Sequence, residues 1–340
     1  MQPLIISRAD FTSFKVPFLK PFTFAGNSVN ERAGFYLSLT SSEGLTARGE
    51  AAPLEGVSHE SMRRARHELT ELRSYLVELK VPCQKDELLE MLRHEPHLLN
   101  ACGSVRFAIE SAILNLASKA AQQSLVEFLG GDLKDVQTAV LLQGNYQEVI
   151  SDLKQFSRQG AKVFKLKVGD RNIALDVKKV LDIRSLLETG SYLRLDANRV
   201  WGLKEACVFA QLAGNQKIDF IEEPVSDPVQ LDAFYQQTHM RIALDESLKP
   251  SSVSQEGVVA YVLKPMVLGL IPTLDWIEEA RGSKRKAIIS SAFESPAGFK
   301  VLANLACLSG QIAGLGTERW FKDVKPIVGE DGAIKKEFLI

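Results

Sequence analysis

The spacing of apolar residues changes at about residue 130, and this change divides the chain into two parts. Beyond it, short apolar runs recur roughly every 20–30 residues, and each is followed by a turn and a stretch with helical spacing. We interpret the runs as strands at residues 138–142, 163–168, 192–196, 218–222, 241–245, 260–264, 287–291 and 312–315. Strands that alternate with helices form parallel βαβ units, and eight such units close into a (β/α)₈ barrel. A doubly wound open sheet is the alternative, but the sequence lacks its glycine-rich phosphate-binding turn.

The first part of the chain has mixed character, which predicts a separate α+β unit. Residues 4–14, 35–40 and 47–51 are strand-like, and Pro21, Gly26, Asn27 and Asn30 indicate a loop between the first two strands. Residues 58–121 have helical spacing, and the wide apolar stripe over 105–118 is typical of a buried helix. We therefore predict an α+β domain over residues 1–125 and a barrel domain over 126–321. We expect the tail, about residues 322–340, to pack back on the first domain.

Composition narrows the choice of partners and compartment. Among 340 residues, 41 are Lys or Arg and 42 are Asp or Glu, so the formal net charge is -1. This balance lacks the basic excess that binds nucleic acid or anionic membranes, and a small molecule is the expected partner. Four scattered cysteines argue against a zinc site or a disulfide framework and fit a reducing compartment. The chain has no signal-peptide pattern and no apolar run near the ~20 residues of a membrane helix, so we expect a cytoplasmic location.

Charged residues end five successive predicted strands of the barrel. They are Lys165 with Lys167, then Asp196, Glu222, Asp245 and Lys264. The carboxyl ends of barrel strands meet at one mouth, where barrel enzymes carry their active sites. One charged strand end is most simply a structural ion pair or a solvated residue. Five in succession are harder to explain in that way, because burying unpaired charge costs several kcal/mol, and they predict a functional site.

The three carboxylates of this set predict a metal site. Asp196, Glu222 and Asp245 come from adjacent strands, and three converging carboxylates would raise one another's pKa unless a cation lay between them. A shell of oxygen ligands selects Mg²⁺, with Mn²⁺ as a substitute, over zinc. The alternative is a cluster of ion pairs between these carboxylates and the lysines.

The lysines predict proton chemistry. Lys165 and Lys167 stand two apart on one strand and therefore on the same face, so we expect each ammonium group to lower the pKa of the other and one lysine to act as a base. Lys264 would approach the substrate from across the mouth. A metal beside facing lysines suits removal of a proton α to a carboxylate, because both stabilise the resulting enediolate.

Together the motifs resemble those of a known family. They are KLK at 165–167, LRLDANR at 193–199, IEEP at 221–224, LDES at 244–247, LKP at 263–265 and ISSAFES at 289–295. The set is similar to that of the muconate-lactonising subgroup of the enolase superfamily, and within it most similar to the o-succinylbenzoate synthases. The resemblance covers essentially the whole chain and implies that the α+β unit is a capping domain. It implies a Mg²⁺-dependent carbon–oxygen lyase of menaquinone biosynthesis, which dehydrates 2-succinyl-6-hydroxy-2,4-cyclohexadiene-1-carboxylate to 2-succinylbenzoate.

The resemblance also implies residue roles. Asp196, Glu222 and Asp245 would hold the metal, Lys167 would remove and return the proton, and Lys165 would support the substrate carboxylate and lower the pKa of Lys167. Lys264 would stabilise the enediolate from the far face, partly by a cation–π contact. Asn198, Ser290 and Ser291 would bind substrate, and two capping segments, residues 20–26 and 50–54, would close the pocket.

Other reactions of the same family remain open. None of the five histidines lies at the sixth or seventh strand end, which argues against an Asp–His base. Residues 314–319 lack the Asp-x-Asp that dipeptide epimerases use, although Glu318 offers one carboxylate. Muconate cycloisomerase has no positive support, whereas two facing lysines would permit racemisation of N-succinylamino acids. A barrel that only binds a dicarboxylate is the non-catalytic alternative.

Overall fold

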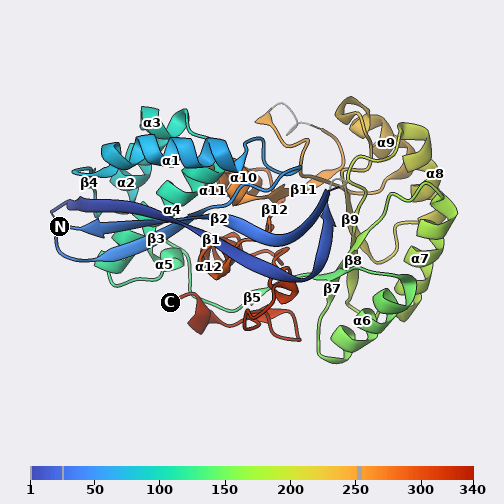
Figure 1. Cartoon of the computed structure of the whole chain (residues 1–340). Helices are drawn as coiled ribbons and strands as arrows, with labels where there is room; N and C mark the ends of the chain where they lie inside the picture. Colours follow the sequence, from blue (N-terminus) through green and yellow to red (C-terminus); the bar gives the residue numbers. More distant parts are fainter. Residues whose placement is uncertain (1, 25–26, 251–254) are drawn as a thin grey trace.

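A computed structural model describes residues 2–24, 27–250 and 255–340. Its N-terminal part is an antiparallel sheet in the order β3-β2-β1-β4, with helices on one face (Figure 1). The strands are β1 (Leu4–Phe24), β2 (Asn27–Ser41), β3 (Thr46–Ala51) and β4 (Lys80–Val81). The helices are α1 (Met62–Leu76), α2 (Lys85–His94), α3 (Pro96–Leu99), α4 (Gly103–Ala120) and α5 (Leu125–Phe128). Helix α4, which contains the predicted buried stripe, packs against β2 and β3.

The loop predicted at Pro21, Asn27 and Asn30 is wrong, because these residues lie in strands, and Gly26 of the same prediction lies outside the described residues. Strands β1 and β2 continue as one long hairpin, and Figure 1 shows it extending toward the barrel. Proline cannot donate a hydrogen bond to a sheet, but the pairing register shifts between Pro17 and Phe22, and such an irregularity accommodates proline. Part of the predicted capping segment at residues 20–26 lies outside the described residues, because residues 25 and 26 are not described.

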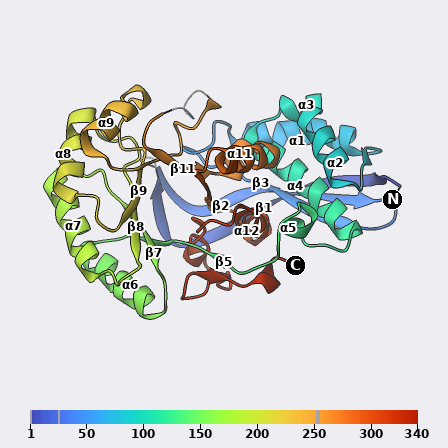
Figure 2. The same cartoon turned by 180° about the vertical axis from the view of Figure 1, so that it is seen from behind.

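The C-terminal part is a parallel barrel, which confirms the predicted fold class: an α/β barrel with an N-terminal α+β domain (Figure 2). Its sheet runs in the order β12-β11-β10-β9-β8-β7-β6. The strands are β6 (Val140–Leu142), β7 (Val163–Lys167), β8 (Tyr192–Asp196), β9 (Ile218–Glu222), β10 (Ile242–Leu244), β11 (Val258–Leu263) and β12 (Lys286–Ile289). The helices are α6 (Tyr146–Arg158), α7 (Ile173–Leu186), α8 (Leu203–Ala213), α9 (Leu231–Thr238), α10 (Pro265–Leu268), α11 (Leu270–Gly282) and α12 (Pro296–Ser309).

The eighth predicted strand is reduced to a seam of two residues. Ala313 bridges Thr138 beside β6, and Gly314 bridges Ser290 at the end of β12. The Ala139 N–H donates to the Ala313 carbonyl at 2.8 Å, and the Gly314 N–H donates to the Ile289 carbonyl at 2.8 Å. These bonds join the two edges of the seven-stranded sheet and close the ring.

The C-terminal tail contacts both parts of the molecule. The Lys322 N–H donates to the Pro17 carbonyl of β1 at 2.8 Å, whereas β13 (Ala333–Ile334) pairs with β5 (Val136–Gln137). The last residues lie on α12, where the ring centroids of Phe299 and Phe338 are 6.1 Å apart. The tail therefore packs on the barrel as well as on the capping hairpin.

Strand alternation explains why charged residues lie above an apolar interior. Phe220, Ala243, Val262 and Ile288 belong to one buried cluster, which also contains Ala260. Two residues further along the same strands come Glu222, Asp245, Lys264 and Ser290, on the same face because side chains alternate. The apolar cluster thus supports a charged layer at the carboxyl ends of the strands.

Two buried glutamates of the N-terminal part cap barrel helices. Glu110 of α4 accepts hydrogen bonds from the Leu270 and Ile271 N–H groups at the start of α11, at 2.7 and 2.9 Å. Glu50 of β3 accepts from the Ser295 N–H at 3.0 Å and from the Gly298 N–H at 2.9 Å at the start of α12. A carboxylate satisfies the unpaired N–H groups of a helix N-terminus and interacts favourably with its dipole, so these contacts join the two parts of the molecule.

Among the described residues, no helix has the length and apolar character needed to cross a membrane.

Candidate active site

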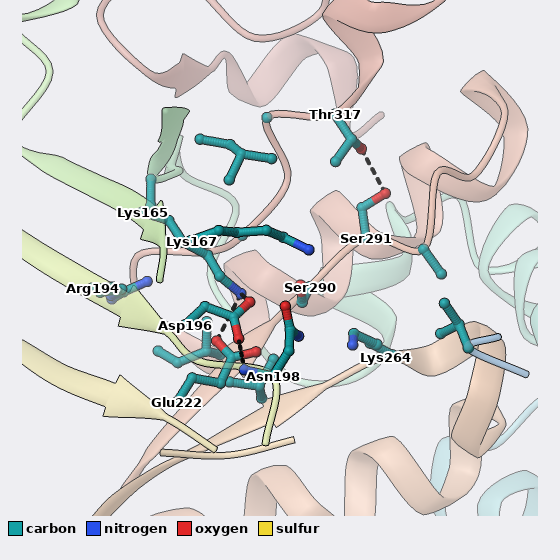
Figure 3. Close-up of a pocket in the computed structure, with 18 of the residues that line it drawn as sticks. Lys165, Lys167, Arg194, Asp196, Asn198, Glu222, Lys264, Ser290, Ser291 and Thr317 are labelled. Carbon is teal, nitrogen blue, oxygen red and sulfur yellow. Dashed lines mark hydrogen bonds and ion pairs between the residues drawn. The ribbon is translucent and has the colours of Figure 1, made fainter. Parts of the chain in front are cut away.

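One pocket at the barrel mouth brings together most of the residues that the sequence singled out. Lys165, Lys167, Asp196, Glu222 and Lys264 line it, and so do the predicted substrate-binding residues Asn198, Ser290 and Ser291 (Figure 3). Asp245 instead lines a neighbouring pocket, which shares Lys264 with the first. The strand ends therefore converge as the barrel geometry predicted.

Other pocket residues were not singled out by the sequence. They include Val57 of the capping domain and Gln143, Arg194, Glu246, Phe293 and Thr317 of the barrel. Arg194 could have been found, because it precedes Asp196 by two residues on β8 and so shares its face. Val57, Gln143, Phe293 and Thr317 lie outside the strands, where spacing carries no such signal.

Ion pairs link the lysines and carboxylates. The Lys165 Nζ lies 2.7 Å from Glu222 Oε2 and 2.9 Å from Asp196 Oδ2. Lys264 forms an ion pair with Asp245. Figure 3 shows the side chains of Asp196 and Glu222 meeting at the Lys165 ammonium group. These contacts bring the lysines and carboxylates together, as both the predicted metal site and the alternative cluster of ion pairs require.

The carboxylates differ in how well their charge is compensated. Burial opposes ionisation of Asp196, but the charges of Lys165 and Lys167 lower its pKa below the ordinary value. Burial raises the pKa of Glu222 well above its ordinary value, and the neighbouring Asp196 charge raises it further. The Lys165 charge, 2.7 Å from Glu222 Oε2, lowers this pKa but does not offset burial and the Asp196 charge.

The donor set fits a divalent cation. Glu222 Oε1 is a buried oxygen without a hydrogen-bond partner, and such an oxygen is a free position for a cation. Oxygen donors alone favour Mg²⁺. Within the described ranges, no three acidic, His or Cys side chains already converge as a ligand cluster. Lys165 occupies the space between two of the carboxylates, so metal binding would require its ammonium group to move.

The expected lowering of the lysine pKa is wrong for Lys165. Burial disfavours its charged form, but the carboxylates of Asp196 and Glu222 outweigh this effect and raise the pKa of Lys165. The pKa of Lys264 is also raised, because Asp245 and Glu222 overcome the effect of burial. The nearby carboxylates, rather than a second ammonium group, therefore decide the direction of the pKa shift of these two lysines.

Backbone conformation fixes the loop that follows β8. Asn198 and Arg199 both adopt positive φ, at 43° and 59°, and the Asn198 N–H donates to Asp196 Oδ1 at 3.2 Å. Asparagine tolerates this left-handed region better than most residues. The turn therefore holds Asp196 and presents Asn198 to the pocket.

The hydroxyl of Ser291 is fully used within the protein. It donates to Glu294 Oε2 at 2.7 Å and accepts from the Phe293 N–H at 2.9 Å and from the Thr317 hydroxyl at 2.7 Å. One hydroxyl has one donor and two acceptor positions, so its capacity is exhausted. Ser290, whose side chain also lines the pocket, is the better placed of the two to meet a substrate.

Glu318 lies away from the chemistry. Its side chain is 3% exposed, it accepts from the Val328 N–H at 3.1 Å, and it lines a separate cavity behind the barrel seam. It is not among the residues that line the pocket of Figure 3. A substrate ammonium group in that pocket would not meet this carboxylate.

Sequence comparisons identify relatives over most of the chain. An enolase C-terminal domain-like model matches residues 148–256, and a model of the mandelate racemase/muconate lactonizing enzyme N-terminal domain matches residues 9–130. The chain is 33% identical over 305 residues to o-succinylbenzoate synthase of Aliivibrio fischeri strain MJ11, covering 86% of this chain and 85% of the relative. It is 30% identical to o-succinylbenzoate synthase of Proteus mirabilis, covering 88% and 85% of the two chains.

Solved structures share the fold at lower identity. The L-Ala-D/L-Glu epimerase of Bacillus subtilis superposes with a TM-score of 0.83 at 22% identity, covering 97% of this chain and 96% of the epimerase. The Mg²⁺-complexed dipeptide epimerase of Cytophaga hutchinsonii superposes with a TM-score of 0.84 at 22% identity, covering 97% and 93%. Both domain models match in chain order, and the capping sheet, the barrel and the charged mouth match the architecture that these motifs predicted. The chain belongs to the enolase superfamily.

Proposed function

We propose that this enzyme is an o-succinylbenzoate synthase, which dehydrates 2-succinyl-6-hydroxy-2,4-cyclohexadiene-1-carboxylate to 2-succinylbenzoate and water. The observation that carries the proposal is the convergence of Lys167 and Lys264 on one pocket beside three carboxylates, in a chain whose relatives of about one-third identity are named for this reaction. Family membership supports enolate chemistry, and the relatives support the particular substrate.

The metal in this proposal is Mg²⁺, held by Asp196, Glu222 and Asp245. When bound, it would compensate the three carboxylates and stabilise negative charge that develops on the substrate carboxylate. Lys165, whose ammonium group now lies between two of these carboxylates, would move out of that space and stay nearby as a further positive charge. Solved relatives from Cytophaga hutchinsonii and Enterococcus faecalis are complexed with Mg²⁺, which supports the choice of ion.

Lys167 is the proposed base. In its neutral form its Nζ takes the proton from the ring carbon that bears the carboxylate, and the electron pair of that C–H bond passes into the enediolate. The enediolate then expels the hydroxyl group from the adjacent carbon. Lys167 returns its proton to this leaving group, which departs as water, so the amine is regenerated and the ring becomes aromatic.

Lys264 is the proposed electrostatic partner. Figure 3 shows its ammonium group approaching the pocket from a different side than that of Lys167. A fixed positive charge there stabilises the enediolate and faces the conjugated ring in a cation–π contact. Neither role requires Lys264 to exchange a proton.

Racemisation of an N-succinylamino acid is the second candidate, because two lysines on different sides of a pocket permit proton transfer at either face of a carbon. Dipeptide epimerisation is less well supported, since Glu318 is turned away from the pocket. Purified protein with Mg²⁺ and each substrate in turn separates the reactions. We expect aromatic 2-succinylbenzoate from the diene, and its absence would refute the synthase assignment.

The metal assignment has its own test. Asp245→Asn should abolish both activity and the response to added Mg²⁺, because one anionic ligand is lost. Asp275→Asn is a matched control, since Asp275 is half exposed, pairs with Arg93 and does not line either pocket. Full activity of Asp245→Asn would remove Asp245 from the metal site.

A further inference from the structure

A second group of buried charges lies beside the pocket, where the capping domain meets the barrel. Arg32 of β2 is 2% exposed, Glu50 of β3 is fully buried and Glu294 after β12 is 1% exposed. None takes part in the proton chemistry proposed above. A buried arginine is costly unless its donors and charge are satisfied, so its surroundings indicate its role.

Arg32 hydrogen-bonds backbone carbonyls on both sides of this junction. Its Nε donates to the Phe293 carbonyl at 3.1 Å, its Nη1 donates to the Pro53 carbonyl at 2.9 Å, and its Nη2 donates to the Ala52 carbonyl. Ala52 and Pro53 lead into Leu54, which lines the pocket, and Phe293 lines it from the barrel. One planar guanidinium group, whose donors have a fixed geometry, thus connects the two segments that form two walls of the pocket.

Phe293 is held in an unusual conformation. Its φ is 62°, a value that is strained for a bulky residue. The Ala292 N–H donates to Glu294 Oε2 at 2.8 Å and the Phe293 N–H donates to Ser291 Oγ at 2.9 Å, so the turn is fixed on one side while Arg32 holds the carbonyl on the other. Such strain persists where the surroundings determine the conformation, and here it directs an aromatic side chain to the pocket.

The two walls form an apolar cluster apart from the main core. Phe18, Leu54, Phe293 and Phe321 make up this cluster, and Val57 packs against it. The rings of Phe18 and Phe293 meet edge to face with centroids 5.7 Å apart. The cluster is small and its residues come from both domains, so neighbouring hydrogen bonds hold it in place. The Arg32 guanidinium group forms such bonds to the segments of Leu54 and of Phe293.

We propose that Arg32 is a positioning residue, which fixes the apolar wall of Leu54 and Phe293 against the part of the substrate that does not react. Arg32 is not among the residues that line the pocket, so it acts through the two segments that it binds. The proposal rests on the proposed function for the identity of the substrate: a cyclic diene carboxylate places its carboxylate among the lysines and its apolar ring edge toward this wall.

Steady-state kinetics of Arg32→Met test the proposal. We expect KM to rise ~10-fold or more while kcat changes less than about threefold, because binding is lost equally from ground state and transition state. Arg32→Lys, which retains a charged donor, should recover part of the affinity. Arg48→Met is the matched control, because Arg48 is an exposed arginine of the same sheet, and its constants should stay within about twofold of wild type. An unchanged KM in folded Arg32→Met overturns the proposal.

Two further measurements keep the test decisive. Hydrogen exchange of segments 52–57 and 291–295 should be faster in Arg32→Met than in Arg48→Met. Equal exchange would contradict the claim that Arg32 holds the two segments together. If Arg32→Met does not fold, Leu54→Ala takes its place, and an unchanged KM there removes this wall from substrate binding and overturns the proposal. Wild-type protein without dehydration activity would refute the proposed function instead, while the exchange comparison would still decide whether Arg32 holds the two segments.

Discussion

Glu223 follows Glu222 directly, yet its side chain turns away from the pocket and reaches the chain beyond β10. Its Oε1 accepts from the Asp245 N–H at 2.8 Å and from the Ser247 N–H at 2.7 Å, and its Oε2 accepts from the Ser247 hydroxyl at 2.6 Å. Its φ of 47° is in the left-handed region. Glu223 therefore sets the backbone position of one proposed metal ligand without being a ligand itself.

Glu223→Gln should weaken Mg²⁺ binding ~10–100-fold, the range typical of residues that orient metal ligands. The amide replaces one acceptor oxygen with a donor, which would face the N–H groups and hydroxyl that Glu223 now binds. Titration calorimetry with Mg²⁺ measures the affinity, and Glu205→Gln, at an exposed position of α8, is the control. Equal affinities in the two variants would show that Glu223 does not position Asp245.

Lys167→Ala should lower kcat by about 10² or more, since it removes the proposed base. Lys162→Ala removes an exposed lysine just before the same strand, where it pairs with Glu188, and should leave kcat unchanged. A normal rate in Lys167→Ala would show that Lys167 is not the base.

Lys264→Arg separates the two candidate reactions. Dehydration needs only positive charge at this position, so this variant should retain part of the activity, whereas Lys167→Arg should lose it. Two-base racemisation needs proton exchange on both sides, and in that case both variants should be inactive. Rates of both variants on both substrates distinguish these outcomes.

At this scale the sequence predicted residues whose position follows from strand periodicity. Lys165, Asp196, Glu222 and Lys264 reach the pocket because strand ends in a parallel barrel converge. Arg32 and Phe293 could not be predicted in the same way. Their importance depends on which carbonyl a side chain reaches and on a left-handed backbone, and neither leaves a regular pattern in sequence.

Between elements, ion pairs join three strands of the barrel. Asp219 of β9 lies 3.2 Å from Arg194 of β8 and 2.6 Å from Lys286 of β12, measured between carboxylate oxygens and side-chain nitrogens. The guanidinium group of Arg194 also lies 5.1 Å from the centroid of the Phe220 ring. One carboxylate thus compensates two cations from strands that are not neighbours in the sheet.

Asp219→Ala should destabilise the protein by about 3–5 kcal/mol, because it leaves the buried Arg194 without its counter-charge. Glu188→Ala removes the partner of Lys162 in a half-exposed pair and should cost no more than about 1 kcal/mol. Urea unfolding of both variants checks the difference. Similar small losses would mean that solvent or other groups already compensate Arg194.

Element predictions were accurate where periodicity was strong and failed where local residue preferences were overridden. The seven regular barrel strands lie within or close to the predicted runs, because apolar runs between helices have few alternative structures. Prolines and asparagines around residue 21 favour a loop in isolation, but pairing over the length of β1 and β2 outweighs that preference. A long-range pairing of this kind is not visible in a local window.

At the scale of the whole molecule, the titratable side chain of Glu50 connects the capping domain to helix α12 of the barrel. Burial raises its pKa to about 7, partly offset by the Ser295 hydrogen bonds. Since the ordinary pKa of this group is 4.5, the folded protein holds the proton more tightly than the unfolded chain. The stabilisation from this proton is fully present below about pH 4.5 and is lost as the pH rises through 7.

Glu50→Gln should therefore flatten the pH dependence of stability. Between pH 4.5 and pH 8 the wild-type protein should lose on the order of 2–3 kcal/mol of unfolding free energy that the variant does not lose, since a pKa unit corresponds to about 1.4 kcal/mol. Glu43→Gln, at an exposed turn residue, should give the wild-type profile. Urea unfolding across this range measures all three proteins, and parallel profiles for Glu50→Gln and wild type would contradict the assignment.

Within the two-residue seam, Gly314 both bridges Ser290 and lines the pocket. A Cβ at Gly314 would come within 3.1 Å of the Ser290 hydroxyl oxygen, and both residues line the pocket. Any side chain added at Gly314 would therefore press on the Ser290 side chain and narrow the space for substrate at the same time. A change at Gly314 thus also alters the surroundings of Ser290, so new specificities in such a protein should arise from the capping segments rather than from the seam.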